Sequence, residues 1–443
     1  MHEGPYAPPE EPPPPGELAR RLYPLEARVP GLSRIPRPVR QGIRSAAFTR
    51  RVRRHTAALD DVRIVAVTGS VGKTTTKDLI SEMLATQGPT LRTPGTNNGL
   101  DGVPATLLAL APHHRYAAVE LGIFSQPGEI AWLASLFRPT VAVLTSVHED
   151  HLQYYGSRER IAREKRALLE RVPPEGTAVV NADDELARRT AEGLACSVVL
   201  AGHAEDADFR ILAARLEWPH GIGFTIATRD RQVEFRAPLL GKHFALSVAL
   251  AAAAAQAVGV PLEVAAAAAA RVRPGPNKMN IVAGPRGSTL LLDEFKSRMP
   301  GVRAALATLV EAPASRRIAV VGELQDRDLT PAGYAELAEL LGNSVDLVVP
   351  VGRAAPILEG LLDETPVAPS ARVEDAAAFL AHEIRKGDVV LVHGPTRQHL
   401  ERIRMLLERQ PVGCSVRRCV FHWHCPDCIY LDSGPPASCV ELA

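Results

Sequence analysis

The sequence of 443 residues is long enough for two or three domains with large hydrophobic cores. Its 46% hydrophobic and 23% charged residues are typical of a soluble globular protein, and its net charge of +1 gives no field that would favour nucleic acid. No apolar run approaches the roughly 20 residues of a membrane-spanning helix, and no signal peptide is visible. We therefore expect a cytoplasmic enzyme, monomeric, without a nucleic-acid partner.

Residues 1–61 form an arm rich in proline and arginine. Residues 1–16 predict an extended leader, and residues 20–54 contain eleven arginines but a single acid, Glu26. Apolar residues among these arginines indicate short amphipathic helices, interrupted by prolines 24, 30, 36 and 38. Two interpretations stay open: an arm that binds a partner or a membrane surface, and a helix that packs on the next domain.

The stretch from Val62 to Leu84 predicts a strand, a glycine turn and a helix. Free N–H groups and the positive end of a helix dipole meet at such a turn, and phosphate is the usual ligand there. Lys73 would reach the β- and γ-phosphates of a nucleotide, and the Thr74 hydroxyl would bind Mg²⁺. The turn is shorter than the common eight-residue P-loop, but a chance glycine turn would not explain this order of elements. The expected phosphate loop consists of Gly69, Ser70, Val71, Gly72, Lys73, Thr74 and Thr75.

Strands and helices alternate through the rest of the chain, which predicts an α/β fold. We expect a central P-loop-type domain with a parallel sheet at 62–284, a smaller Rossmann-like domain at 285–410 and a separate tail at 411–443. The strands expected in the central domain include Ile64–Val67, Ala117–Leu121, Val141–Thr145 and Ala178–Asn181, and helices are expected at 244–258 and 261–272. Those expected in the second domain are Leu290–Leu292, Ile318–Val321, Leu347–Val351 and Val389–Val392.

Several polar residues follow predicted strands, where sites of open α/β sheets lie. Glu120 ends one strand, and its carboxylate is the hard oxygen ligand that Mg²⁺ prefers beside Thr74. The other candidates are Asn97, Asn98, His151 and Lys165. The alternatives are a surface or helix-capping role for His151 and a solvated position for Lys165.

Seven ordered segments of the chain resemble the Mur ligase family. They are TGSVGKTTTK (68–77), NNGLDGVPATLL (97–108), ELG (120–122), RPTVAVLTSVHEDHLQYYGS (138–157), NADD (181–184), GKHFALSVALAA (241–252) and LLDEFKSRMPGV (291–302). Their order and spacing cover residues 62 to about 400. The branch that adds D-alanyl-D-alanine to a muramyl tripeptide is the most similar, and the ligase half of cyanophycin synthetase is similar too.

The resemblance implies an ATP- and Mg²⁺-dependent acid–amino acid ligase. A carboxylate would attack ATP to give an acyl phosphate and ADP, and an amine would then displace phosphate. By resemblance, Lys73, Glu120, His151 and Lys165 are catalytic, with Thr74 and Glu120 on a first metal and His151 and Lys165 on a second. The matching lysine of the family is often carbamylated. The resemblance also implies that the C-terminal domain closes over the nucleotide, and we expect the hinge near 284–288.

Several positions depart from the family pattern. Two asparagines of the family are Phe244 and Ser247 here, so contacts to the adenine base must be remade. Lys278 replaces an arginine of the domain junction, and Glu294 is the acid expected in the linker segment; the resemblance makes both nucleotide contacts. These changes favour an alternative, a non-catalytic nucleotide-binding or partner protein of the same fold. Residues 1–61 cannot supply the family's UDP-sugar domain, so we do not expect a UDP-muramyl peptide as substrate.

The tail is rich in cysteine and histidine, and its ligand types permit a Zn²⁺ site. The candidate ligands are Cys414, Cys419, His422, His424, Cys425, Cys428 and Cys439. The alternatives are a disordered tail with free thiols and an appended stretch without selected structure. Disulfides are less expected in a cytoplasmic chain.

Overall fold

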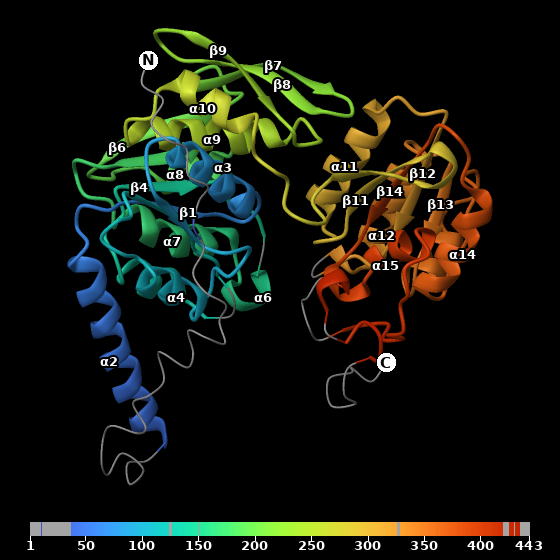
Figure 1. The fold of residues 1–443 in the computed structure, drawn as a ribbon, viewed down its shortest axis with the longest axis horizontal. Helices are drawn as coiled ribbons and strands as arrows, with labels where there is room; N and C mark the ends of the chain where they lie inside the picture. Colours follow the sequence, from blue (N-terminus) through green and yellow to red (C-terminus); the bar gives the residue numbers. More distant parts are fainter. Residues whose placement is uncertain are drawn as a thin grey trace. The chain divides into compact units, whose positions relative to one another are not determined.

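The computed structural model describes Glu10 and residues 37–123, 126–149, 151–325, 328–419, 425–428 and 430–434. The chain divides into two compact units (Figure 1). The first unit comprises Met1–Arg215, Gly223–Ala237 and Phe244–Val272, and the second comprises Leu216–Ile222, Pro238–His243 and Arg273–Ala443. The second unit thus begins before the expected boundary at 284, and it includes the tail that we expected to be separate.

A nine-stranded sheet forms the centre of the first unit. Its order is β2-β3-β1-β4-β5-β6-β7-β8-β9, and the neighbouring strands from β2 to β7 are parallel. Each of the strands β1, β3, β4 and β5 has a short apolar sequence and is almost wholly buried, as in sheets covered on both faces. The predicted parallel sheet is confirmed, whereas the run of successive strands from β6 to β9 was not predicted. The strands are β1 (Arg63–Thr68), β2 (Thr90–Arg92), β3 (Tyr116–Glu120), β4 (Val141–Leu144), β5 (Thr177–Asn181), β6 (Ser197–Gly202), β7 (Phe209–Glu217), β8 (Gly221–Ala227) and β9 (Gln232–Ala237).

The helices of the first unit pack on this sheet and on one another. α3 lies against α9, whose alanine-rich sequence permits close approach, and α7 packs on β1 and β4. The helices are α2 (Arg37–Ala57), α3 (Lys73–Ala85), α4 (Gly102–Leu108), α5 (Glu129–Ala134), α6 (Leu152–Tyr155), α7 (Arg158–Leu169), α8 (Glu185–Thr190), α9 (Phe244–Ala257) and α10 (Leu262–Ala269).

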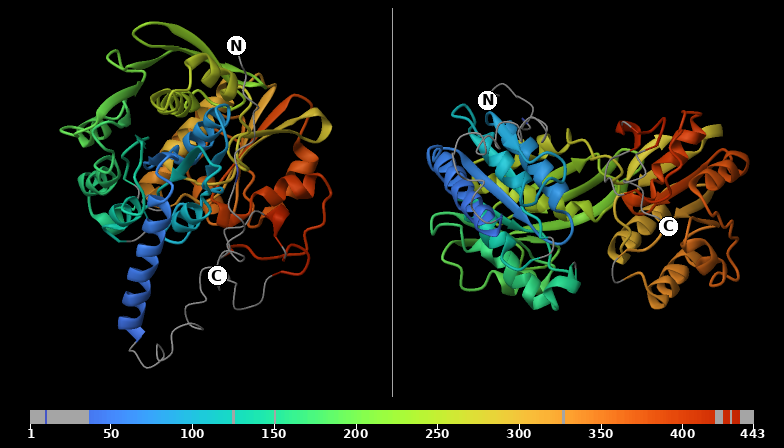
Figure 2. Two further views of the ribbon diagram at one scale, coloured as in Figure 1. Left: turned by 60° about the vertical axis from the view of Figure 1, so that its left-hand side comes forward. Right: turned by 90° about the horizontal axis from the view of Figure 1, so that it is seen from below.

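In the described part of the arginine-rich arm, residues Arg37–Ala57 form the helix α2, which Figure 2 shows from two further sides. Of the prolines expected to interrupt the arm, Pro38 falls in the first turn of α2, where proline is tolerated, and prolines 24, 30 and 36 lie outside the described residues. Val52 is fully buried in the core of the first unit. The Thr56 hydroxyl donates to the Leu136 carbonyl at 2.7 Å, and Arg53 Nε donates to the Ser135 carbonyl at 2.9 Å. These contacts favour the interpretation of a helix that packs on the next domain.

The second unit contains a five-stranded sheet in the order β10-β11-β14-β12-β13. β10 is antiparallel to β11, and the other pairs are parallel, so the predicted second α/β domain is confirmed. The elements are β10 (Asn280–Ala283), β11 (Thr289–Asp293), β12 (Arg316–Val321), β13 (Leu347–Pro350), β14 (Asp388–His393), α11 (Met299–Glu311), α12 (Pro331–Gly342), α13 (Ala354–Glu359), α14 (Val373–Glu383) and α15 (Glu401–Leu407), with short 3-10 turns η3 (Pro285–Gly287), η5 (Thr396–Gln398) and η6 (Cys425–Asp427).

The segment that we expected to be a hinge, 284–288, is the turn between β10 and β11. Ala283 pairs with Thr289 across this turn, and both strands belong to the second unit. The segment therefore joins two strands of one sheet and does not connect the units. Among the helices of the described residues, none has the length and apolarity to cross a membrane.

Candidate functional site

The predicted phosphate loop lies between β1 and α3. Gly69 (φ 150°) and Gly72 (φ 83°) both adopt backbone conformations that favour glycine. A Cβ atom at position 69 would lie 1.9 Å from Thr145 Oγ1, so no side chain fits there. The backbone of the loop therefore lies so close to the end of β4 that only glycine fits at position 69.

Lys73 begins α3 and folds back over the loop. Its ammonium donates to the carbonyl oxygens of Gly69 at 2.8 Å and Ser70 at 3.3 Å. The side chain is half-buried, and it lies at the helix N-terminus, where N–H groups and the dipole attract an anion. Thr74 and Thr75 occupy the same first turn and are also half-buried. The loop thus places a cation and two hydroxyl side chains beside an anion site.

The segment after β4 holds the loop in shape. The backbone N–H of Ser70 donates to the Ser146 carbonyl at 2.9 Å, and that of Val71 donates to Ser146 Oγ at 3.1 Å. Thr145 Oγ1 donates to the Val71 carbonyl at 2.6 Å. These bonds fix the loop before any ligand binds, which reduces the ordering cost of binding.

Glu120 at the end of β3 is the centre of a buried polar cluster. Thr74 Oγ1 donates to Glu120 Oε1 at 3.2 Å, and Asn98 Nδ2 donates to the same oxygen at 2.5 Å. Glu120 is fully buried, and its Oε2 has no hydrogen-bond partner among the described residues. A buried carboxylate oxygen without a donor requires a cation or a proton. Thr74 and Glu120 supply the hard oxygen ligands of Mg²⁺, so the residues present fit that ion.

The loop that carries Asn98 is fixed to α3 and β3. Lys77 is fully buried on α3 and donates to the carbonyl oxygens of Thr93 at 2.7 Å and Gly95 at 3.2 Å. Gly122 N donates to the Asn98 carbonyl at 2.9 Å. A Cβ at position 122 would lie 2.4 Å from Asn98 Oδ1, so glycine leaves the space for this amide. Asn97, the preceding residue, is half-buried.

Lys165 and His151 lie on the segment that follows β4. Lys165 is fully buried on α7, so it is not the solvated helix lysine of the alternative interpretation. A buried ammonium is retained only where it has partners or carries a modification that removes its charge. His151 is half-buried, precedes α6 and has a φ of 62°, an uncommon conformation for histidine that marks a constrained position. The metal-binding role of both residues stays a prediction.

Ser247 and Phe244 replace the two asparagines of the family pattern on α9. Both side chains are buried. A Cβ at Gly72 would lie 3.3 Å from Ser247 Oγ, so this hydroxyl faces the phosphate loop. Position 247 therefore lies next to the phosphate loop, and its contact with a nucleotide stays a prediction.

In the second unit, Asp293 and His393 end the paired strands β11 and β14. Asp293 Oδ2 lies 2.8 Å from His393 Nδ1, and His393 Nε2 is buried without a partner among the described residues. Glu294 is fully buried, and burial together with Glu401 raises its pKa well above the usual range. The nucleotide contact that the resemblance implies for Glu294 stays a prediction. Lys278 Nζ lies 4.8 Å from the centre of the Phe295 ring.

The tail cysteines do not form a ligand group with one another in the part of the chain that the structure describes. Cys414, Cys419 and Cys425 are buried free thiols, and Cys428 is half-buried. The structure instead brings Cys425 to His399 and Glu401. Burial, followed by the Glu401 charge, raises the pKa of the Cys425 thiol to about 12. The predicted ligands His422, His424 and Cys439 lie outside the described residues.

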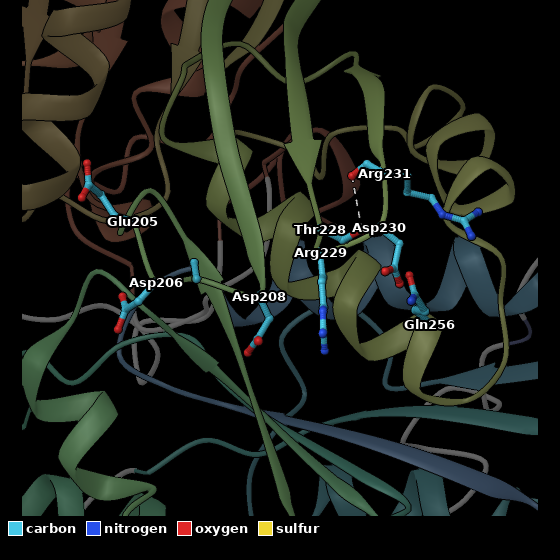
Figure 3. Close-up of a pocket in the computed structure, with 9 residues that line it drawn as sticks. Glu205, Asp206, Asp208, Thr228, Arg229, Asp230, Arg231 and Gln256 are labelled. Atoms are coloured by element: carbon cyan, nitrogen blue, oxygen red, sulfur yellow. Dashed lines mark hydrogen bonds between the residues drawn. The ribbon is translucent and has the colours of Figure 1, made fainter.

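A pocket of about 380 Å³ lies at the turns between β6 and β7 and between β8 and β9. Figure 3 shows the side chains that line it, which are mainly charged. Arg231 donates to Glu263 at 3.1 Å, and Asp208 accepts from the Leu200 N–H at 2.8 Å. None of the lining residues belongs to the phosphate loop or the Glu120 cluster. We assign this pocket no role in the candidate site.

Substitution of Glu120 by glutamine tests the cation site. Glutamine keeps the volume but removes the negative charge, so we expect about a 100-fold loss of Mg²⁺-dependent ATP turnover and a higher Mg²⁺ requirement. Titration of activity and of nucleotide binding with Mg²⁺ measures both. Glu175→Gln, at an exposed ion pair with Arg138, is the matched control. An unchanged Mg²⁺ requirement in Glu120→Gln would show that this carboxylate does not bind the metal.

Comparison with protein families gives two matches in this chain. Residues 67–255 match the Mur ligase middle domain, and residues 277–396 match the glutamate ligase domain of Mur ligases. The first match begins within β1 and ends in α9, and so contains the phosphate loop and Glu120. The second match contains Asp293 and His393.

Curated relatives carry the name UDP-N-acetylmuramoyl-tripeptide–D-alanyl-D-alanine ligase. The protein of Escherichia coli (strain K12) is 33% identical over 297 residues, which cover 66% of this chain and 65% of the relative. The protein of Mycobacterium tuberculosis (strain H37Rv) is 33% identical over 380 residues, which cover 80% of this chain and 74% of the relative. The chain thus spans slightly less than two thirds of the Escherichia coli protein.

Solved structures of MurF proteins are also similar to this chain. A crystal structure of MurF from Acinetobacter baumannii has a TM-score of 0.74 and 25% identity, covering 82% of this chain and 80% of that chain. The MurF ligase of Thermotoga maritima in complex with ADP has a TM-score of 0.73 and 23% identity, covering 83% and 84%. The second similarity concerns the fold alone.

Proposed function

This chain belongs to the Mur ligase family, and from that premise we propose that it is an ATP-dependent ligase that joins a carboxylate to an amine. The observation that carries the proposal is the cluster of Thr74, Glu120 and Asn98 beside the phosphate loop. It combines an anion site with a buried carboxylate oxygen that has no donor among the described residues. Nucleoside triphosphate with a divalent cation satisfies both features at once.

The first step is phosphoryl transfer from ATP to the substrate carboxylate. A carboxylate oxygen attacks the γ-phosphorus, the bond to the β-phosphate oxygen breaks, and ADP leaves. We propose that Lys73 exchanges its bonds to the loop carbonyls for bonds to the phosphate oxygens, where charge accumulates in the transition state. Thr74 and Glu120 would hold Mg²⁺, which neutralises phosphate charge when bound.

The second step is acyl transfer from the acyl phosphate to an amine. The amine nitrogen attacks the acyl carbon, a tetrahedral intermediate forms, and the carbon–oxygen bond to phosphate breaks. Inorganic phosphate leaves, and the nitrogen loses a proton to give the amide. ATP as substrate is consistent with a cytoplasmic location.

Phosphate release by the purified protein tests the proposal. The assay supplies ATP, Mg²⁺ and a panel of carboxylates, and D-alanyl-D-alanine is the first amine to try because the relatives' names contain it. We expect phosphate release only when a suitable carboxylate is present, and amide by mass spectrometry only when the amine is added. Tight nucleotide binding without turnover across the panel would instead support the non-catalytic alternative.

A further inference from the structure

Three buried side chains from separate segments converge in the second unit, outside the proposed reaction. His399 follows the turn η5, Glu401 begins α15, and Cys425 begins η6 in the tail. Their side chains are at most 3% exposed. One nitrogen, one oxygen and one sulfur atom of the three lie within 4.8 Å of one another. None of these residues is needed for phosphate binding or acyl transfer.

The spacing of the three donor atoms suits a tetrahedral metal. His399 Nδ1 lies 3.1 Å from Glu401 Oε1 and 3.2 Å from Cys425 Sγ. Bonds of about 2.0–2.3 Å at tetrahedral angles place neighbouring ligand atoms roughly 3.3–3.6 Å apart. Both distances from His399 Nδ1 are therefore within a few tenths of an ångström of that spacing, and the Glu401 oxygen and Cys425 Sγ lie within 4.8 Å of each other.

The hydrogen bonds around the cluster leave buried carboxyl oxygens without donors. Glu401 Oε1 accepts from the Cys425 N–H at 3.1 Å, but Glu401 Oε2 has no partner among the described residues. Both carboxyl oxygens of the neighbouring buried Glu294 also lack one. An enclosed region with this excess of acceptors is costly unless a cation or shared protons occupy it.

Arg402 fixes the sulfur side of the cluster. Its Nε donates to Cys425 Sγ at 3.2 Å and its Nη2 to Cys414 Sγ at 3.3 Å. Its Nη1 donates to the carbonyl oxygens of Cys414 and Val416, each at 3.0 Å. Donors directed at a sulfur atom orient it and stabilise a metal-bound thiolate.

We propose that His399, Glu401 and Cys425 form a structural Zn²⁺ site that fastens the cysteine-rich tail to α15. Nitrogen, oxygen and sulfur donors together are the ligand set that zinc accepts, and thiolate disfavours Mg²⁺ and Ca²⁺. The ion displaces the thiol proton of Cys425, and the negative charges of Cys425 and Glu401 balance the dication. Water completes the tetrahedron. The site is distinct from the tail-only ligand set that the sequence indicates.

Metal analysis of the purified full chain tests the proposal. We expect about one zinc ion per chain after dialysis against zinc and removal of the excess. Cys425→Ser and His399→Ala should each lower the zinc affinity at least about tenfold, as measured by competition with a chromophoric chelator. Cys428→Ser changes the half-buried cysteine three residues away and should bind zinc normally. Replacement of zinc by Co²⁺ should give a sulfur-to-metal absorption band that Cys425→Ser lacks.

Two results would overturn the zinc site. Absence of zinc binding by the wild-type chain would overturn the proposal and favour shared protons between Glu294 and Glu401. Normal binding in His399→Ala with loss in Cys428→Ser would also overturn it, because the ion would then be held within the tail. Circular dichroism of each variant confirms that the α/β units remain folded. Phosphate release is a separate readout, so failure of the ligase proposal would leave the zinc result interpretable.

Discussion

Replacement of Lys73 by alanine should reduce ATP turnover at least about 1000-fold, or by about 4 kcal/mol of transition-state stabilisation, and leave the protein folded. The ammonium begins α3 and already lies over the phosphate loop, bonded to the carbonyl oxygens of Gly69 and Ser70. Because it is half-buried, its removal opens no cavity in the core. Initial rates of phosphate release and the thermal midpoint measure the two effects separately.

Lys386→Ala is the matched control for this experiment, since Lys386 is an exposed lysine of the second unit. It should keep wild-type turnover. Lys73→Arg should rescue little, because a planar guanidinium cannot replace a compact ammonium within this tight loop. Near-normal turnover in a folded Lys73→Ala protein would remove the phosphate-site assignment.

Lys165 should be equally intolerant of change. We expect Lys165→Met, which keeps most of the buried volume, to fold normally and to lose at least about 100-fold in activity. If the lysine acts as a carbamate, a small carboxylic acid should partly restore the activity of the Lys165→Ala variant. The acid would fill the cavity and replace the lost oxygen ligand. Rates with and without millimolar acetate or formate measure the rescue, and mass spectrometry at high bicarbonate detects the carbamate.

Arg163→Met provides the control on the same helix, since Arg163 is exposed on α7. It should leave activity unchanged. Full activity in Lys165→Met would reduce this lysine to a structural residue. Loss of activity without rescue by the acid would indicate that the lysine acts through its own amino group and would reject the carbamate.

The parts of the site that the sequence could predict are local in the chain. The phosphate loop depends on one strand, one turn and one helix, so Lys73 and Thr74 follow from consecutive residues. Glu120 could be predicted because it ends an apolar strand that pairs directly with β1. The seven segments that resemble Mur ligases are confirmed by the two domain matches.

Burial of single charged residues could not be predicted in the same way. Lys165 lies in a helix with four arginines and two glutamates, and that composition is typical of an exposed surface. Its burial depends on tertiary packing, because α7 contacts both the sheet and the neighbouring helices. Glu294 is likewise fully buried, whereas Asp293 beside it reaches His393.

Contacts between segments that are distant in the chain could not be predicted from the sequence either. Asp293 and His393 are a hundred residues apart and meet only because β11 and β14 are neighbours. His399 and Glu401 carried no signal in the sequence, because their partner Cys425 comes from the tail. The strands β6, β7 and β9 have mixed exposure, unlike the almost wholly buried strands that were predicted from their apolar runs.

The close approach of Gly122 to Asn98 has an evolutionary consequence. A methyl group at position 122 would meet the asparagine amide at 2.4 Å, and that amide is bonded to Glu120. Neither residue can change alone without disturbing the carboxylate, so the two positions should covary among relatives. Lineages that acquire alanine at 122 should have a smaller side chain at 98.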